Sequence, residues 1–419
     1  MAGEWRERPL GELTDNFDGI RVPVKEADRR TGPYPYYGAS GVVDHVDNYL
    51  YDGEYLLIAE DGENLRTRNT PVAFLARGKF WVNNHAHILR GNREADTRFL
   101  MYALSAADIS GYLTGSTMPK LTQSNMNRVP LLTPPLPEQR AIVQILGTLD
   151  DKIDSNRRLN ETVEAMARAL FKSWFVDFDP VRAKAEGRDP GLPQPLADMF
   201  PDSFENSELG EIPKGWEIKS IGDLADVAGG TTPSTKEPAY WEGGSHTWAT
   251  PKDLSGLSVP VLLDTERRIT DAGLSQIGSG LLPKGTVLLS SRAPIGYLAV
   301  AEIPVAINQG FIAMTPKTGT SNIFLLLWAS VAHEEIVSRA NGSTFLEISK
   351  ANFRPIPVVT PSADMMRVFE ELARPLYERI VESARESRTL AALRDTLLPK
   401  LITGELRVMN RERFAGMQA

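Results

Sequence analysis

The feature that most constrains this chain is an internal repeat. GSTMPKLTQSNMNRVPLLTPPLPEQR begins at Gly115, and GSTFLEISKANFRPIPVVTPSADMMR begins 227 residues later at Gly342. Aligned without a gap, the two stretches of 26 residues agree at eight positions, whereas unrelated sequences would agree at roughly one or two. A duplicated unit of this kind predicts two similar lobes within one chain.

The repeat extends toward the N-terminus of each lobe. Three further pairs of segments correspond, WRERPLGEL with WEIKSIGDL (from Trp5 and Trp216), GEYLLIAEDG with GTVLLSSRAPIG (from Gly53 and Gly285), and VNNHAHIL with INQGFIAM (from Val82 and Ile307). Short apolar runs between Gly, Pro and Asn predict strands and turns. A helix is expected after the strands of each lobe, over 98–110 and 322–339.

A long helical pattern follows each lobe. Residues of the first recur at 4-3-4-3 spacing, which is typical of a coiled-coil seam: Ile142, Leu146, Leu149, Ile153, Asn156, Asn160, Val163, Ala167, Leu170 and Trp174. The second pattern contains Phe369, Leu372, Leu376, Ile380, Leu390, Leu393 and Leu397, with Ser383 and Ser387 as the repeat equivalents of the two asparagines. A helix over about residues 138–176 would be roughly 58 Å long at 1.5 Å per residue. We therefore expect the two helices to pair antiparallel; the alternative is that each packs only on its own lobe.

Helix-weakening residues occur at similar places in both patterns. Pro375 corresponds to Thr148, which follows Gly147, and we expect a kink or a helix start there. Pro399 is expected to end the second helix. The fold class predicted is α/β of the α+β type, with two repeated lobes separated by two long antiparallel helices.

Composition narrows the class of protein. A chain of 419 residues suits two or three domains, and the absence of cysteine excludes disulfides and thiolate metal sites. No apolar run has the length of a signal peptide or a membrane span, so we expect a soluble, cytoplasmic protein. Of the net charge of −8, residues 177–211 carry −6, with 3 Lys/Arg against 9 Asp/Glu. The lobes are close to neutral, which permits DNA binding without indicating it.

Motifs for catalysis are mostly missing. The sequence has no G-x-x-x-x-G-K-[ST] phosphate loop and no Asn/Asp-Pro-Pro-Tyr/Phe of a base methyltransferase. His85 and His87 form an H-x-H without a third ligand at useful spacing, which two strand residues explain as well. Asp202, Glu217 and Lys219 mimic the carboxylate–lysine set of Mg²⁺-dependent nucleases, which leaves a nuclease as an alternative.

The helical segments resemble a known family. PLPEQRAIVQILGTLDDKIDSNRRLNETVEAMARALFKSWFVDFDP and LLPKLITGELRV are similar to the helical regions of type I restriction–modification specificity subunits. PYPYYGASGVV, GGTTPS and INQGF resemble segments of the target-recognition domains of that family. The resemblance covers essentially the whole chain in the expected order.

The resemblance implies a non-catalytic subunit in which each target-recognition domain reads half of a split double-stranded DNA site. It implies target-recognition domains at 1–136 and 212–361, helical spacers at 137–178 and 362–405, an acidic Pro-rich connector at 179–211 and a tail at 406–419. Two methyltransferase subunits would dock on the helices and lobes, and restriction subunits with motor activity would join them. No cofactor is expected in this chain, because S-adenosylmethionine, ATP and Mg²⁺ would be held by those partners. A scaffold that does not bind DNA is the other alternative.

Candidate DNA-contacting residues are those whose side chains reach base edges or phosphates. In the first lobe they are Arg29, Arg30, Tyr36, Tyr37, Asn64, Arg66, Arg68, Asn83, Asn84, His85, Ser116 and Thr117. In the second lobe they are Thr231, Thr232, Ser234, Lys236, Ser291, Arg292, Asn308, Gln309, Ser343 and Thr344. For the two Gly-Ser-Thr loops, a turn needed for folding is an equal alternative, and exposed loop residues or backbone caps are the alternatives for the others.

Candidate partner contacts lie at the two ends of the helical regions. They are Glu138, Gln139, Arg140, Leu401, Ile402, Thr403, Gly404 and Glu405. Capping of the helices within the chain is the alternative for these residues.

Overall fold

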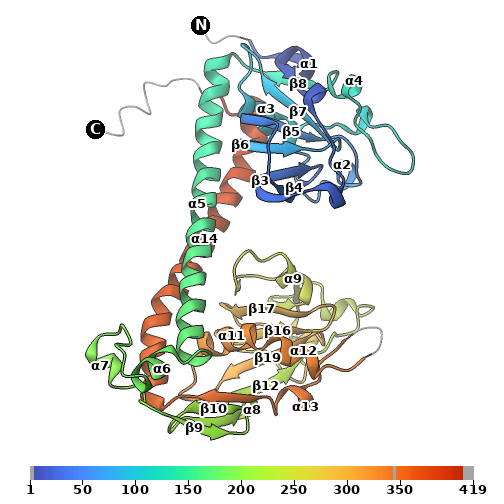
Figure 1. Cartoon of the computed structure of the whole chain (residues 1–419). Helices are drawn as coiled ribbons and strands as arrows, with labels where there is room; N and C mark the ends of the chain where they lie inside the picture. The colour runs from blue at the N-terminus through green and yellow to red at the C-terminus, as the bar shows by residue number, and fades with distance from the viewer. Residues whose placement is uncertain (1–3, 343–345, 409–419) are drawn as a thin grey trace, which may run out of the picture. The chain divides into compact units, whose positions relative to one another are not determined.

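The computed structural model describes residues 4–342 and 346–408, which form two compact units. Unit 1 comprises residues 1–153 and 389–419, and unit 2 comprises residues 154–388. Each unit contains one lobe and one part of each of two long helices, α5 (Leu136–Phe175) and α14 (Ala363–Ile402) (Figure 1). None of the helices described is long and apolar enough to cross a membrane. The domain boundaries given above stay a prediction.

The lobe of unit 1 is built on a six-stranded sheet of order β2-β7-β5-β6-β3-β4. Its strands are β2 (Thr14–Asn16), β3 (Thr31–Gly38), β4 (Gly41–Val46), β5 (Tyr51–Ala59), β6 (Ala73–Val82) and β7 (Ala86–Gly91). β1 (Arg6–Pro9) pairs with β8 (Pro130–Thr133) outside this sheet. The shorter helices are α1 (Leu10–Leu13), α2 (Asn64–Thr67), α3 (Thr97–Ala106) and α4 (Gln123–Met126).

The central strand β5 is apolar on both faces because both faces are covered. Leu56 packs in the cluster that contains Phe99 of α3 and Ile142 of α5. Leu57 points to the opposite face and packs in a second cluster with Phe80, as the alternation of side chains along a strand requires. The lobe thus has one core under the long helices and another on the far side of the sheet.

The lobe of unit 2 has a five-stranded sheet of order β12-β19-β16-β17-β14. These strands are β12 (Ala225–Gly229), β14 (Val261–Leu262), β16 (Val287–Ser291), β17 (Ile295–Ala301) and β19 (Phe311–Pro316). A three-stranded sheet is formed by β13 (His246–Ala249), β15 (Arg267–Ile269) and β18 (Ala306–Ile307), and β11 (Glu217–Ser220) pairs with β20 (Pro357–Thr360). Its short helices are α8 (Ile221–Leu224), α9 (Pro251–Ser255), α10 (Asp271–Leu274), α11 (Asn322–Val331), α12 (His333–Ser338) and α13 (Lys350–Phe353).

The repeat predicted from the sequence is also a repeat of topology. β2-β7-β5-β6-β3 in unit 1 and β12-β19-β16-β17-β14 in unit 2 have the same order and the same parallel or antiparallel pairings. Trp5 and Trp216 precede the equivalent strands β1 and β11. Even the helix caps correspond, since Asp96 caps α3 and Ser321 caps α11 through the same pair of backbone N–H groups.

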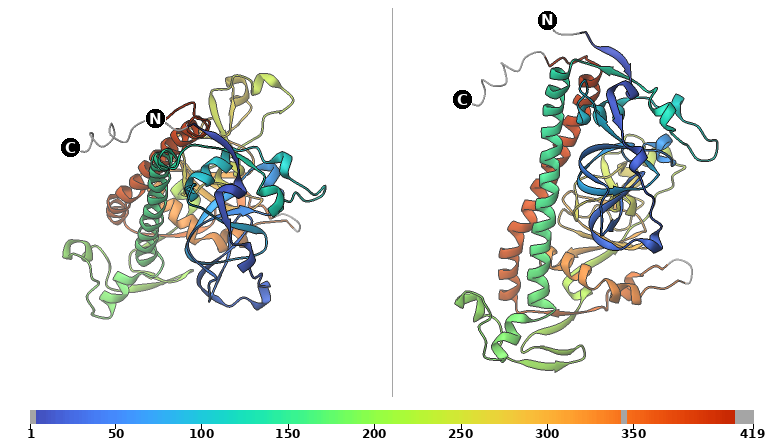
Figure 2. Two further views of the ribbon diagram at one scale, coloured as in Figure 1. Left: turned by 90° about the horizontal axis from the view of Figure 1, so that it is seen from above. Right: turned by 45° about the horizontal axis from the view of Figure 1, so that its top comes forward.

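The two long helices pack against each other antiparallel, as expected from the seam (Figure 2). In unit 1, Arg394 of α14 donates a hydrogen bond to Asp150 of α5 at 2.8 Å. In unit 2, Asn156 of α5 is hydrogen-bonded to Glu386 and Ser387 of α14. Each helix also packs on a lobe, because Ile142 and Leu401 enter the core of unit 1 and Phe171 and Phe369 that of unit 2. The two helices therefore pair as expected, and the alternative that each packs only on its own lobe is wrong.

Details of the helices differ from the sequence-based expectation. α14 runs without interruption through Pro375 and continues past Pro399 to Ile402, so neither proline starts or ends it. Leu372 and Leu393, which the heptad places in the seam, are 43% and 45% exposed, and Ala373 is buried instead. The buried stripe follows a period nearer to 3.6 because it faces a lobe as well as the other helix.

The connector after α5 is more ordered than its composition predicts. It contains α6 (Asp179–Ala185), α7 (Gln194–Ala197) and a hairpin of β9 (Phe204–Ser207) and β10 (Gly210–Pro213). Val181 and Phe200 are buried in the main core of unit 2. A few apolar residues thus anchor a segment that is otherwise acidic and rich in proline.

Candidate nucleic-acid interface

Three loops meet at one end of the sheet in the first lobe. They are the turn after β5 (residues 60–62), the loop before β7 (residues 83–85) and the hairpin of residues 114–120. The backbone N–H of Glu60 donates to the carbonyl of His85 at 2.8 Å, and the N–H of Leu121 donates to the carbonyl of Glu60 at 2.8 Å. Asp61 and Lys120 form a β-bridge. We call these loops the rim of the first lobe.

The second lobe has the same rim, made of the same backbone hydrogen bonds. The N–H of Ser291 donates to Gly310 at 2.8 Å, and the N–H of Ile348 donates to Ser291 at 3.0 Å. Arg292 and Glu347 form the β-bridge. The rim of the second lobe therefore comprises residues 291–292, 308–310 and the described part of the hairpin of residues 341–347.

The asparagine before the last strand has the same role in both rims. Asn83 Oδ1 accepts from the N–H of His85 at 2.8 Å, and Asn308 Oδ1 accepts from the N–H of Gly310 at 2.8 Å. These two side chains cap a backbone turn, which is the alternative weighed for them above. The next residues, Asn84 and Gln309, are exposed, and Gln309 accepts a hydrogen bond from Thr232. Both side chains lie at the surface of their rim.

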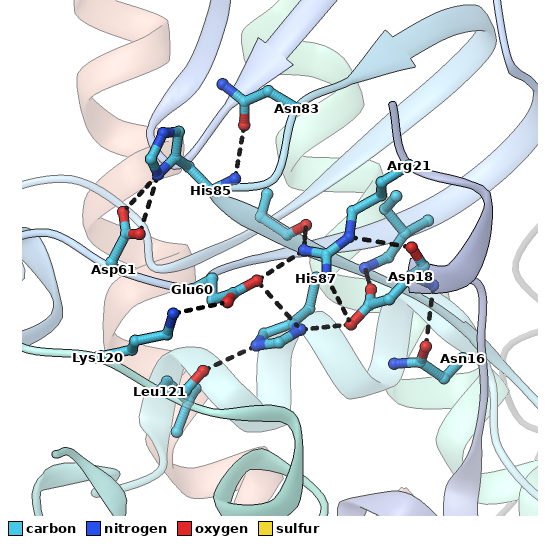
Figure 3. A network of polar contacts seen from close by, with 12 residues as sticks. Asn16, Asp18, Arg21, Glu60, Asp61, Asn83, His85, His87, Lys120 and Leu121 are labelled. Atoms are coloured by element: carbon cyan, nitrogen blue, oxygen red, sulfur yellow. Dashed lines mark hydrogen bonds and ion pairs between the residues drawn. The ribbon is translucent and has the colours of Figure 1, made fainter. Parts of the chain in front are cut away.

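A buried ionic network supports the rim of the first lobe (Figure 3). His87 is hydrogen-bonded through Nδ1 to Asp18 at 2.6 Å and through Nε2 to the carbonyl of Leu121 at 2.8 Å. Glu60 accepts from Arg21 at 2.7 Å and lies 3.2 Å from the Lys120 ammonium. The network joins the turn after β5 to the base of the hairpin.

The carboxylates of this network are held ionised. Burial opposes ionisation of Asp18, but hydrogen bonds from His87 and from the N–H of Ile88 outweigh it and hold the pKa of Asp18 below its usual value. Burial likewise opposes ionisation of Glu60, and hydrogen bonds from Arg21 and Lys120 and the charge of His87 lower its pKa. The network therefore tethers the rim best when both groups are charged.

The two histidines of the H-x-H have different partners and do not form a joint site. His85 is half-exposed and its Nδ1 lies 2.9 Å from both carboxylate oxygens of Asp61, whereas His87 is buried. Across residues 4–342 and 346–408, no group of three or more His, Cys, Asp or Glu could hold a metal ion. In the nuclease-like set, Lys219 pairs with Glu217 at 2.9 Å and Asp202 accepts from the neighbouring Ser203.

Arg66 and Arg68 of the first lobe bond to the backbone of that lobe. Arg66 donates to the carbonyl of Gly115 at 3.0 Å and so orients the Gly-Ser-Thr loop, in which Ser116 and Thr117 are exposed. Arg68 donates to the carbonyls of Ser105 and Ala107. The side chain of Asn64 bonds to Thr70. Of these residues, Arg66 belongs with the rim.

Other predicted residues of the first lobe lie on the β3–β4 side. Tyr36 is 1% exposed and its hydroxyl accepts from the N–H of Val24 at 3.0 Å, so it is a core residue. Arg29 lies over the Tyr36 ring and pairs with Asp44 at 3.1 Å. Tyr37 packs against Phe74 and Phe80, and burial raises its pKa. Arg30 is exposed.

The predicted residues of the second lobe divide between the rim and its surroundings. Ser291 is only 2% exposed and contributes backbone to the rim, whereas Arg292 is partly exposed. Thr231 bonds through its N–H to Ile307, while Ser234 and Lys236 are exposed. Ser343 and Thr344 lie outside the described residues.

The predicted partner contacts are partly internal. Glu138 accepts from Trp5 at 3.1 Å and from Arg407 at 2.8 and 3.0 Å, and Gln139 is buried with bonds to residues 94, 96 and 134. Leu401 and Ile402 are buried, and Gly404 lies against Trp5. Arg140, Thr403 and Glu405 are exposed.

Sequence reasoning missed the charged partners within the rims. Glu60, Asp61, Lys120 and Glu347 are not among the residues that the sequence predicts to contact DNA. The repeat did carry a signal, because Lys120 in one copy corresponds to Glu347 in the other. Opposite charges at equivalent positions indicate different ionic partners, which are Glu60 for Lys120 and Arg292 for Glu347.

Comparison with known proteins identifies what these lobes resemble. The model of the family described as Type I restriction modification DNA specificity domain matches residues 2–165 and 213–365, more than half of the chain. The HindI specificity subunit of Haemophilus influenzae is 25% identical over 478 aligned positions, covering 96% of this chain and 100% of that protein. The MjaIX specificity subunit of Methanocaldococcus jannaschii is 40% identical over 163 residues, 38% of each chain.

A solved structure has the same fold. The S subunit of a type I restriction–modification system from M. genitalium superposes with a TM-score of 0.62 at 17% identity, covering 95% of this chain and 96% of that one. The arrangement of two repeated lobes and two long helices is thus shared at low sequence identity.

Proposed function

Since the chain belongs to the family of type I restriction–modification DNA specificity subunits, the non-catalytic components of their complexes, we propose that each lobe reads one half of a bipartite DNA sequence through its rim. The observation that carries this proposal is the equivalence of the two rims. The same three loops are joined by the same backbone hydrogen bonds in both lobes, while the side chains they display differ. A shared backbone frame with different side chains suits two readers of different base sequences.

The rim supplies both classes of contact that DNA recognition needs. The Gly-Ser-Thr loop of the first lobe offers exposed hydroxyl and N–H groups for phosphates, and Arg66 fixes its position. Asn84, His85, Arg292 and Gln309 offer side chains with the reach to contact base edges. Because each lobe is close to neutral, we propose that part of the phosphate-neutralising charge comes from partner subunits.

The two long helices carry the features of a spacer and a docking surface. We propose that they fix the gap between half-sites and bind two methyltransferase subunits, which bring S-adenosylmethionine, with restriction subunits bringing ATP and Mg²⁺. Met166 on α5 and Leu393 on α14 are 227 residues apart, as the repeat requires of equivalents, and are 54% and 45% exposed. Two equivalent apolar side chains left exposed on the helices suit two copies of one partner. The complex would act on DNA in the cytoplasm.

Mapping of adenine methylation in the native cell, with and without this gene, tests the proposal. We expect loss of one motif made of two short half-sites around a fixed unspecified gap. A methylome that is unchanged by deletion, together with no salt-sensitive DNA binding by the chain assembled with its methyltransferase subunits, would contradict it.

A further inference from the structure

The two rims carry opposite charges at equivalent backbone positions. Asp61 bridges to Lys120 in the first lobe, and Arg292 bridges to Glu347 in the second. The two bridges are equivalent in position. In each lobe, the first residue of the bridge follows Glu60 or Ser291, and the backbone of Glu60 or Ser291 is hydrogen-bonded to the other two loops of the rim. An acid on the turn and a base on the hairpin in one lobe thus become a base on the turn and an acid on the hairpin in the other.

The side chain of Asp61 does not point toward Lys120. Lys120 contacts Glu60, which faces inward toward Arg21 and His87, whereas Asp61 faces His85 (Figure 3). The His85 side chain is 51% exposed and that of Asp61 is 22% exposed, so this pair reaches the surface of the rim. The carboxylate is oriented by a neighbour and still has an accessible edge.

Arg292 is held in a comparable way. Its guanidinium lies 3.6 Å from the Glu347 carboxylate, and the two side chains are 37% and 48% exposed. An ion pair this exposed contributes little to folding stability. Folding stability therefore does not account for the position of the Arg292 guanidinium on the rim.

We propose, on the basis of the function proposed above, that Asp61 and Arg292 are the equivalent base-reading residues of the two lobes and that they have opposite hydrogen-bonding polarity. An ionised carboxylate only accepts hydrogen bonds, so Asp61 selects the exocyclic amine of cytosine in the first half-site. A guanidinium only donates, so Arg292 selects O6 and N7 of guanine in the second half-site.

The same chemistry rejects the wrong base. A carboxylate close to the DNA backbone is repelled by phosphates, and a base edge that presents only acceptors adds to that cost, so only an amine donor makes the contact favourable. An arginine that faces an amine places two hydrogen-bond donors against each other and leaves both without an acceptor. His85 and Glu347 hold the reading groups in place, which reduces the conformational entropy lost on binding.

The test uses the full chain assembled with its methyltransferase subunits. Complexes with wild-type chain, Asp61→Asn or Arg292→Gln would methylate a double-stranded DNA library in which each position of the wild-type motif is randomised in turn. We expect Asp61→Asn to relax selection by about 10- to 100-fold at one G·C pair of one half-site only. Arg292→Gln should do the same at one G·C pair of the other half-site only. Glu347→Gln, which keeps the arginine, should give a smaller relaxation at the Arg292 position.

The outcomes separate this inference from the function on which it rests. If the wild-type complex methylates no bipartite motif, the proposed function fails before any variant is compared. If the wild-type motif is bipartite but both variants keep every preference, or each relaxes both half-sites equally, only the base-reading assignment is overturned. Thermal unfolding of each complex identifies a variant that is merely misfolded. Asp61→Glu and Arg292→Lys then replace it in the same assay, and we expect the same base to be preferred less strongly because the polarity is kept and the geometry is changed.

Discussion

The side-chain amide of Asn156 donates a hydrogen bond to Glu386 Oε2 at 2.8 Å and to Ser387 Oγ at 3.2 Å, and so joins α5 to α14 through a buried polar layer. Ser383 completes the layer by donating to the Asn156 carbonyl at 3.4 Å. Asn160 is equally buried, but its Oδ1 has no hydrogen-bonding partner in the described part of the chain. The repeat makes Asn156 and Asn160 the counterparts of Ser383 and Ser387. One sequence pattern thus gives an Asn156 amide that donates to α14 and an Asn160 whose Oδ1 lacks a partner among the described residues.

Replacement of the two asparagines should therefore have opposite effects on stability. Asn156→Leu leaves the carboxylate of Glu386 and the Ser387 hydroxyl without this donor and should destabilise unit 2 by about 1–3 kcal/mol. Asn160→Leu removes an unsatisfied buried group of nearly the same size and should be neutral or stabilising. Differential scanning calorimetry of the two variants provides a matched comparison. A similar loss of stability in both would show that Asn160 is satisfied by water or by a partner.

Low pH should lower the folding stability of the first lobe, because its buried network contains ionised carboxylates. Because Asp18 and Glu60 have pKa values below their ordinary values of 3.8 and 4.5, ionisation of each stabilises the folded state above about pH 4–5, and this stabilisation is lost as the pH falls through the folded pKa values. Asp18→Asn should reduce the dependence of the unfolding temperature on pH between about pH 5 and pH 3. Asp47→Asn, at an exposed position of the same lobe, serves as the control and should leave the slope unchanged.

We expect Met166 and Leu393, two exposed apolar residues on the long helices, each to contact one methyltransferase subunit. Met166→Asp and Leu393→Asp should each weaken binding of one of two subunits by about tenfold or more, because burial of such a side chain contributes about 1.5–3 kcal/mol. Native mass spectrometry should then show complexes with one methyltransferase subunit in place of two. Arg157→Asp, at another exposed position of α5, should leave the stoichiometry unchanged. Loss of both subunits from each single variant would contradict two equivalent surfaces.

Two residues near the start of α5 should have different roles, one in stability within the chain and one in binding of a partner. Glu138 binds Trp5 and Arg407 within unit 1, so Glu138→Ala should lower the unfolding temperature of unit 1, with a cost on the order of 1–3 kcal/mol for the unpaired partners. Arg140 is exposed, and Arg140→Ala should leave that temperature unchanged while weakening methyltransferase binding. Thermal unfolding and subunit binding by calorimetry measure both. Reversed results would make Glu138 the docking residue.

Sequence alone determined the features that depend on local pattern and on duplication. The repeat at Gly115 and Gly342 predicted two lobes of like topology, and the heptad predicted two long helices that pair. Asn156 and Ser383 interrupt the apolar stripe at equivalent positions of the two helices, and the structure shows that these positions meet. These predictions hold because strand alternation, helix periodicity and internal repetition are written in residue spacing.

The tertiary structure decided which polar residues face inward. Tyr36, Gln139 and Ser291 carry groups suited to recognition, yet packing buries them, and Asn83 and Asn308 are used to cap turns. Asp61 lies beside His85, and Arg292 beside Glu347, only because loops far apart in the chain meet at one end of the sheet in each lobe. Such contacts depend on strand order and long-range hydrogen bonds, which residue spacing does not encode.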